Sequence, residues 1–149
     1  MARHSADHEQ ATVQIQIARL KAPSATARLQ AAATLGAMGS RAGSATGALA
    51  GALGDRRAQV RKVAALALGG IGTEARAAVP ALVMALRNEH EAVRRAAAEA
   101  LGDLGAEARV AVPGLRRAMR DRDEGVRKKA ALALEKIKSE VRAAILRAA

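Results

Sequence analysis

The feature that most constrains this chain is an internal repeat of 33 residues. The dipeptide Val-Arg at positions 60–61 recurs at 93–94 and again at 126–127. Residues 60–86 laid over residues 93–119 give 16 identities in 27 positions. A fixed period of this length is typical of solenoids, in which each unit buries its apolar face only by stacking on its neighbours. We therefore expect one elongated domain of equivalent units.

The repeat frame divides the chain into three full units between two incomplete ones. Leu35, Gly36 and Gly39 carry the frame backward, because they keep the spacing of Leu68, Gly69 and Gly72 in the next unit. Within the single domain 1–149 we place an N-terminal half repeat at 8–23, full repeats at 24–57, 58–90 and 91–123, and a C-terminal capping repeat at 124–149.

Each full unit is predicted to be a pair of antiparallel helices. In the unit 58–90, a first apolar stripe at helical spacing comprises Val60, Ala64, Ala67, Leu68 and Ile71, and a second comprises Val79, Leu82, Val83 and Leu86. Gly69 and Gly72 are expected to close the first helix, and Pro80 either opens or bends the second. The chain contains no Phe, Tyr or Trp, so its core must be built from small side chains on closely packed helices.

The two ends of the array depart from this pattern. A single helix at about 8–21 precedes the first full repeat, and the last unit has Glu135 and Lys138 at the glycine positions and Leu146 at the proline position. We expect the last unit to form one capping helix from about 124 to 147. Residues 43–54 contain four glycines, which predicts the weakest second helix or, alternatively, a close packing seam.

The repeat resembles the short HEAT repeats, a kind that includes the HEAT-like repeats of phycobilisome lyases. The matching pattern is a turn Asp, then Val-Arg, Ala-Ala, Leu-Gly, a second Gly, and Ala-Val-Pro-x-Leu. The Thr-Pro-Leu-His signature of ankyrin repeats and the aromatic positions of tetratricopeptide repeats are absent. The resemblance implies an all-α fold, an α-solenoid of stacked antiparallel helical hairpins. It indicates an architecture and not an activity.

The resemblance also implies a ladder, in which a turn Asp hydrogen-bonds an Arg early in the next helix and links the units. The corresponding pairs, with partners six residues apart, are Asp55 and Arg61, Asn88 and Arg94, and Asp121 and Arg127. Ala22 stands at this position before Arg28, which leaves the first rung without its Asp. We expect these residues to be structural.

No arrangement of residues predicts catalysis. The chain has no Cys and three His, so a thiolate metal site and a Cys nucleophile are excluded. HEAT-like hydroxylases bind iron through His-Glu pairs, but His8-Glu9 and His90-Glu91 do not occupy equivalent repeat positions. A bilin lyase is expected to offer aromatic or polar residues to its ligand, and none is evident. We predict no enzyme, no metal and no cofactor.

The positive charge is the remaining functional signal. Lys and Arg outnumber Asp and Glu by 25 to 14, a net charge of +11, which favours acidic partners. Rows of cations at repeat spacing could follow a phosphate backbone, although no aromatic residue is available to stack on bases. A solvated helix surface explains the same charge.

The sequence thus predicts a non-catalytic, monomeric, cytoplasmic scaffold that binds an acidic protein partner and no membrane. The predicted contact residues lie on second helices, outside the core pattern: Met84, Arg87, Arg116, Arg117 and Arg120. Sequence-independent nucleic-acid binding is the first alternative, and a lyase-like or accessory subunit of an enzyme is the second.

Overall fold

The computed structural model describes residues 2–149, and within that range it contains helices and no strand. The α-helices are α1 (Ala2–Arg19), α2 (Ala25–Ala37), α3 (Thr46–Ala52), α4 (Ala58–Ile71), α5 (Val79–Ala85), α6 (Glu91–Leu104), α7 (Val112–Ala118) and α8 (Glu124–Ala148). Three 3₁₀ segments lie between them: η1 (Gly39–Ala45), η2 (Gly72–Ala78) and η3 (Gly105–Ala111). The predicted all-α class is confirmed.

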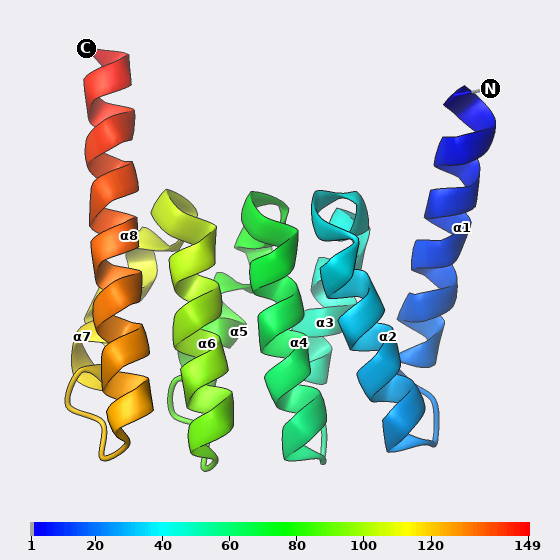
Figure 1. Cartoon of the computed structure of the whole chain (residues 1–149), viewed down its shortest axis with the longest axis horizontal. Coiled ribbons are helices and arrows are strands. Elements are labelled where there is room, and N and C mark those ends of the chain that lie inside the picture. The colour runs from blue at the N-terminus through cyan, green and yellow to red at the C-terminus, as the bar shows by residue number, and fades with distance from the viewer. Residues whose placement is uncertain (1) are drawn as a thin grey trace.

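The helices form two layers (Figure 1). The first helices of the units, α2, α4, α6 and α8, stand side by side, and the short helices α3, α5 and α7 lie behind them. Helix α1 flanks α2 at the N-terminal end, and the two termini lie at opposite ends of the row. Each first helix packs mainly on the first helices of the adjacent units, which is the stacking expected of an α-solenoid.

A glycine at the end of each first helix reverses the chain. Gly39, Gly72 and Gly105 have φ values of 60°, 77° and 58° and are the only residues with positive φ between positions 2 and 149. This left-handed backbone is readily available only to glycine. The prediction that Gly72 closes the first helix is therefore confirmed.

The second half of each unit is not one continuous α-helix. A 3₁₀ segment follows the glycine, and the α-helix begins only at Val79 or Val112, with the proline in its first turn. Proline suits the first turn of a helix because its missing N–H would be unpaired there. Helix α3 begins at the equivalent Thr46 with Gly47 in place of the proline, so the proline fits this start without being its only cause. Pro80 therefore opens the second helix, which was one of the two predicted outcomes.

A second set of glycines lets neighbouring first helices approach closely. A Cβ atom added to Gly36, Gly69 or Gly102 would lie 2.8–3.0 Å from a Cα atom in the next first helix, belonging to Ala67, Ala100 and Ala133 respectively. The expectation that Gly69 ends its helix is wrong. Gly69 lies inside α4 and is required for the contact between α4 and α6.

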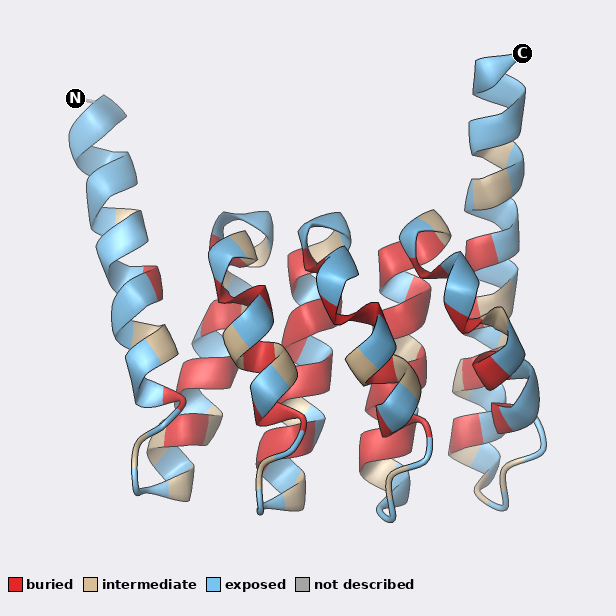
Figure 2. Ribbon diagram, turned by 180° about the vertical axis from the view of Figure 1, so that it is seen from behind, coloured by how far each residue is buried: buried red, intermediate tan, exposed pale blue. Residues whose placement is uncertain are grey.

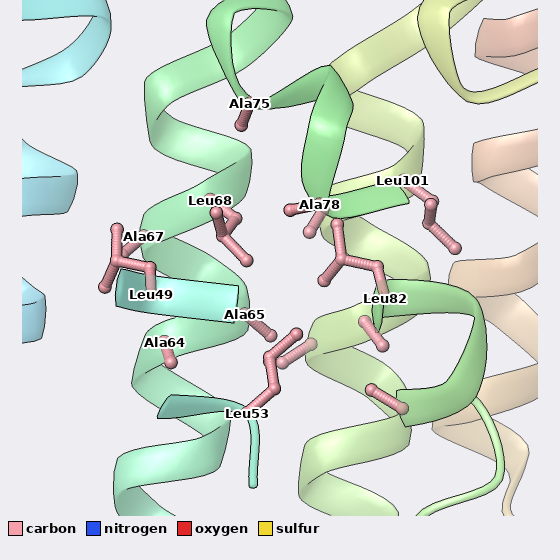
Figure 3. Close-up of a cluster of buried hydrophobic side chains, with 14 of the residues drawn as sticks. Leu49, Leu53, Ala64, Ala65, Ala67, Leu68, Ala75, Ala78, Leu82 and Leu101 are labelled. Atoms are coloured by element: carbon pink, nitrogen blue, oxygen red, sulfur yellow. The ribbon is translucent and has the colours of Figure 1, made fainter. Parts of the chain in front are cut away.

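The core between the two layers is made mainly of Leu and Ala, with some Val and Ile. Figure 2 shows the buried residues on the inner surfaces of both layers, and Figure 3 shows Leu49, Leu68, Leu82 and Leu101 pointing into the space between them. All four leucines are 0% exposed. The expected core of small and aliphatic side chains is thus observed, at the close helix spacing that Ala and Gly permit.

The terminal helices α1 and α8 are longer than the others and project past their ends on one side of the molecule (Figure 2). Helix α8 runs from Glu124 to Ala148, as predicted for a capping unit without the glycines and proline. Helix α1 begins at Ala2, earlier than the predicted start near residue 8. Residues 2–7 contain neither Gly nor Pro, so nothing in them stops the helix.

The glycine-rich segment 43–54 is not the close packing seam that its spacing suggested. No atom lies within 4 Å of a Cβ added to Gly47 or Gly51. Only Gly43 is in close contact, because its added Cβ would lie 3.1 Å from the Glu74 Cβ. The observed packing therefore agrees with an intrinsically weak second helix at this position.

Residues 58–85 are long and apolar enough in composition to cross a membrane. They do not form one straight rod, because the chain turns at Gly72 between α4 and the segment formed by η2 and α5. Their apolar side chains, among them Leu68 and Leu82, form the centre of the core.

Candidate partner-binding surface

Buried Arg–Asp pairs join the first helix of a unit to the turn at the end of the same unit. The Arg28 guanidinium donates to both carboxylate oxygens of Asp55, at 2.8 and 3.2 Å. Arg94 donates in the same way to Asp121, at 2.9 and 3.1 Å. Each arginine thus bridges its own unit to the turn at the end of that unit, 27 residues later. We call these contacts the ladder.

The predicted pairing within the ladder is wrong in one respect. The Asp55 carboxylate does not bind Arg61; the Arg61 side chain instead donates to the main-chain carbonyl of Asp55, at 2.8 Å. Arg127 contacts the carbonyl of Asp121 in the same way, at 2.7 Å. The acceptor for each of these arginines is the main-chain carbonyl of the residue six positions earlier. Every residue type has such a carbonyl, so this hydrogen bond does not require an Asp at that position.

This main-chain contact also explains why the first rung forms without an Asp. Arg28 donates to the carbonyls of Ala22 and Pro23, both at 2.9 Å, while its other nitrogens bind Asp55. The first rung, which the sequence put in doubt because Ala22 stands at the Asp position, is therefore formed. Arg28 belongs to the ladder, although only its position in the repeat frame pointed to it.

The second unit lacks the carboxylate. Asn88 occupies the ladder position, and its side-chain oxygen accepts the His90 N–H at 3.1 Å. Arg61 has no carboxylate opposite its Nε, which is buried and has no hydrogen-bond partner among residues 2–149. A nearby acid, Glu89, is highly exposed and lies 3.6 Å from the Arg61 Nη2. The middle rung is therefore incomplete.

The ladder lowers the pKa values of its two carboxylates, Asp55 and Asp121. Burial raises the pKa of Asp55, but the hydrogen bonds from Arg28 and from the Arg57 N–H outweigh burial and hold that pKa below its usual value. Asp121 shows the same balance, with Arg94 and the Asp123 N–H as donors, so its pKa is also lowered. Both groups are therefore charged at neutral pH.

A separate ion pair fixes the capping helix. Arg95 donates to both oxygens of Asp123 at 2.7 Å, and the Asp123 side chain also accepts the Val126 N–H at the start of α8. The hydrogen bond from Arg95 lowers the pKa of Asp123 strongly. This pair has no counterpart in the earlier units, where His90 and Arg57 stand at the Asp123 position.

A groove lies between the ends of α5 and α7. It has a volume of about 440 Å³, and its apolar base includes Val83, Leu86 and Gly114. Arg87 and Arg117 line it together with Arg122, and all three are exposed. Within residues 2–149 none of the three forms an ion pair. The groove therefore offers three free cations beside an apolar base.

The structure separates the other predicted contact residues. Met84 is 76% exposed and lines a smaller depression between α3 and α5. Arg116 lies on the opposite side of α7, beside α8. Arg120 is exposed near the end of α7 and lines neither groove. Only Arg87 and Arg117 thus share one site.

Sequence reasoning missed Arg122, which completes that site. The predicted contact residues were all placed on second helices, whereas Arg122 lies in the turn after α7. One feature of the sequence could have pointed to Arg122, namely that it directly follows the ladder residue Asp121. The ladder holds that turn in place and therefore fixes the direction in which the side chains next to Asp121 point.

The two His-Glu pairs do not come together. His8 lies in α1, and His90 directly precedes α6, which α2 and α4 separate from α1 (Figure 1). Among residues 2–149 no group of three or more His, Asp or Glu side chains is placed to hold a metal ion.

Two-layer stacking, glycine reversals and an Arg–Asp ladder define a helical-repeat protein of the HEAT type. The family model for HEAT repeats matches residues 13–102 and 79–149, so the chain belongs to the HEAT repeat family. A comparison with curated proteins gives no match.

Solved structures share the architecture. An engineered protein is 28% identical with a TM-score of 0.70, and the match covers 85% of this chain and 62% of that one. Human deoxyhypusine hydroxylase is 30% identical with a TM-score of 0.70, over 85% of this chain and 43% of the enzyme.

The complex of CpcE and CpcF of phycocyanin lyase from a Nostoc species is 24% identical with a TM-score of 0.60, over 85% of this chain and 65% of that one. This likeness shows the shared fold alone. The chain spans less than two thirds of the length of each of these three proteins.

Proposed function

We propose that this protein is a non-catalytic, cytoplasmic scaffold that binds an acidic segment of a protein partner in the groove between α5 and α7. The observation that carries the proposal is the placement of Arg87, Arg117 and Arg122 around an apolar base, with no ion pair to any residue that the structure describes. A segment with one or two carboxylates beside an apolar side chain would match both parts of this groove.

The ladder supports the proposal because it holds the walls of the groove. Arg94 and Asp121 both line the groove, and their mutual hydrogen bonds fix the turn that presents Arg122. Cations on a rigid backbone lose less conformational freedom on binding than cations on a mobile loop. Within this pair the charge of Arg94 is balanced by that of Asp121. The net positive charge of the groove therefore comes from the exposed arginines.

The test is affinity capture from lysate with the triple variant Arg87→Gln, Arg117→Gln and Arg122→Gln, which removes the three exposed cations that line the groove. Exposed charges contribute little to stability, so helicity and melting temperature should stay nearly unchanged. We expect the captured protein to be lost. A control with the same change of net charge is Arg3→Gln, Arg56→Gln and Arg147→Gln, which alters exposed arginines outside the groove. Equal capture by both triple variants would place the site elsewhere.

The alternative, binding of nucleic acid, is favoured by the net charge of +11. A protein that follows phosphates should lose about tenfold to a thousandfold of its affinity for random duplex DNA between low and moderate salt. A protein-binding scaffold should bind such DNA weakly even at low salt. Tight and steeply salt-dependent binding in a fluorescence titration would reverse the order of the two proposals.

A further inference from the structure

At the α8 end of the array there is a place for a second-layer helix that residues 2–149 do not fill. In the full units the 3₁₀ segment packs on the first helix of its own unit, as η2 does on α4, and the short helix after it packs on the first helix of the next unit, as α5 does on α6. The last unit instead continues as the single helix α8 (Figure 1). Beside α7, the side of α8 that would receive the second-layer segment of its own unit is therefore open.

The burial of equivalent residues shows the vacancy directly. Leu68 and Leu101 are 0% exposed, whereas Leu134, at the same position in the last unit, is only partly buried. Val79 is 2% exposed, and its counterpart Val112 on α7 is also only partly buried. Both incompletely buried residues line one groove, which has a volume of about 610 Å³.

The base of this groove is a continuous apolar strip. Beyond Leu134 it follows α8 through Ile137, Val141 and Ile145 to Leu146, and Ile145 and Leu146 are 64% and 66% exposed. Residues 134–146 extend over about 18 Å of helix, which is roughly three turns. Exposed apolar strips of this kind mark interaction surfaces.

The rim of the groove is basic. Its charged residues are Arg109, Arg116, Lys138 and Arg142, with Glu135 as the one acid. No ion pair joins any of them to another described residue. The rim therefore favours an occupant with carboxylates on both flanks of its apolar side.

We propose that this groove binds an amphipathic helix of a partner protein, about three turns long, with an apolar stripe flanked by Asp or Glu. The helix occupies the position of the missing second helix and completes the burial of Leu134 and Val112. This surface is separate from the groove between α5 and α7 and does not depend on the function proposed for that groove.

A second copy of this chain is a poorer occupant. The helix most similar in position to a second-layer helix is α1, which exposes only Ile15 among its large apolar side chains. Its charges are mixed, because Arg3 and Arg19 accompany Asp7 and Glu9. It offers neither a continuous apolar stripe nor an acidic flank.

The experiment uses fluorescent, hydrocarbon-stapled helical peptides of about 15 residues with Leu at positions i, i+4, i+7 and i+11. One peptide has Glu on both flanks of the Leu stripe, and a second has Lys at the same positions. We expect at least tenfold tighter binding of the Glu peptide in fluorescence polarisation. Equal affinity of the two peptides, or no binding of the Glu peptide, would overturn the proposal.

The site is located by variants and by methyl NMR. Ile145→Gln with Leu146→Gln should weaken binding at least tenfold, whereas the control Leu132→Gln, 58% exposed on the same helix but outside the groove, should not. The chain has five isoleucines. The Glu peptide should shift the δ1 methyls of Ile137 and Ile145 and leave that of Ile71 unchanged. Shifts elsewhere, or self-association abolished by the double variant, would contradict a partner helix in this groove.

Discussion

The Asp121 carboxylate accepts two hydrogen bonds from the Arg94 guanidinium, at 2.9 and 3.1 Å, across 27 residues of sequence. The two side chains are 12% and 7% exposed, so the pair is nearly buried. It links the first helix of the third unit to the turn that precedes the capping helix. The Arg28–Asp55 pair repeats this relationship at the other end of the array.

Removing the charge of Asp121 should therefore destabilise the protein. Asp121→Asn leaves the buried Arg94 without its counter-charge, and we expect a loss of roughly 2–3 kcal/mol in the free energy of unfolding. The matched control is Asp103→Asn, which breaks the exposed pair with Lys136 and should cost at most about 1 kcal/mol. Urea denaturation measures both; equal losses would show that the ladder adds nothing beyond surface charge.

Stability should also depend on pH in a defined direction. The pKa values of Asp55, Asp121 and Asp123 are lowered in the folded protein, so the folded state binds fewer protons than the unfolded state in acid. The stabilisation is complete above the unfolded pKa near 4 and is lost as the pH falls through the folded values. We expect unfolding free energies to decline from about pH 5 downward, and to decline less in Asp121→Asn. Identical pH profiles of variant and wild type would contradict this.

The incomplete middle rung predicts a stabilising substitution. Asn88→Asp places a carboxylate opposite Arg61, whose buried Nε has no partner among the described residues, and retains an acceptor for the His90 N–H. We expect a gain of roughly 1–2 kcal/mol in the free energy of unfolding. Ser44→Asp adds the same charge at an exposed position of η1 and serves as the control. If the two variants gain equally, the effect comes from net charge and not from the rung.

The repeat itself was predictable, because the residues that recur with its period act on the conformation of their own segment of the chain. Gly72 and Pro80 act through backbone conformation, and the Leu stripe acts through helical spacing. The role of Gly69 was not predictable in this way. Its meaning depends on Ala100 in the next unit, and no local rule distinguishes a helix-ending glycine from one that admits a neighbouring helix.

The candidate sites were less predictable than the fold. Arg87 and Arg117 lie in adjacent units, and their convergence depends on the angle between α5 and α7. Arg116 and Arg117 both lie on a second helix outside the core pattern, which predicts one shared surface, but adjacent residues on a helix point about 100° apart. The C-terminal groove required a comparison of burial between units, which a sequence does not provide.

Two groups of glycines should respond to alanine in opposite directions. Gly47→Ala with Gly51→Ala should add about 1 kcal/mol to stability, because both positions have open space and Ala favours the helix. Gly36→Ala should destabilise, since its Cβ would lie 2.8 Å from the Ala67 Cα. Hydrogen exchange should be faster in residues 43–54 than in 76–87 and should slow in the first variant. Equal protection of the two segments in the wild type would refute a weak first repeat.

The scaffold proposal is tested most directly by capture from lysate treated with nuclease, at a series of salt concentrations, with protein and nucleic acid in each eluate identified. We expect a specific protein to remain bound after nuclease treatment and at moderate salt, because its apolar contacts in the groove between α5 and α7 are insensitive to salt. Capture that disappears with nuclease, or eluates that contain nucleic acid released in proportion to salt, would contradict a protein-binding scaffold.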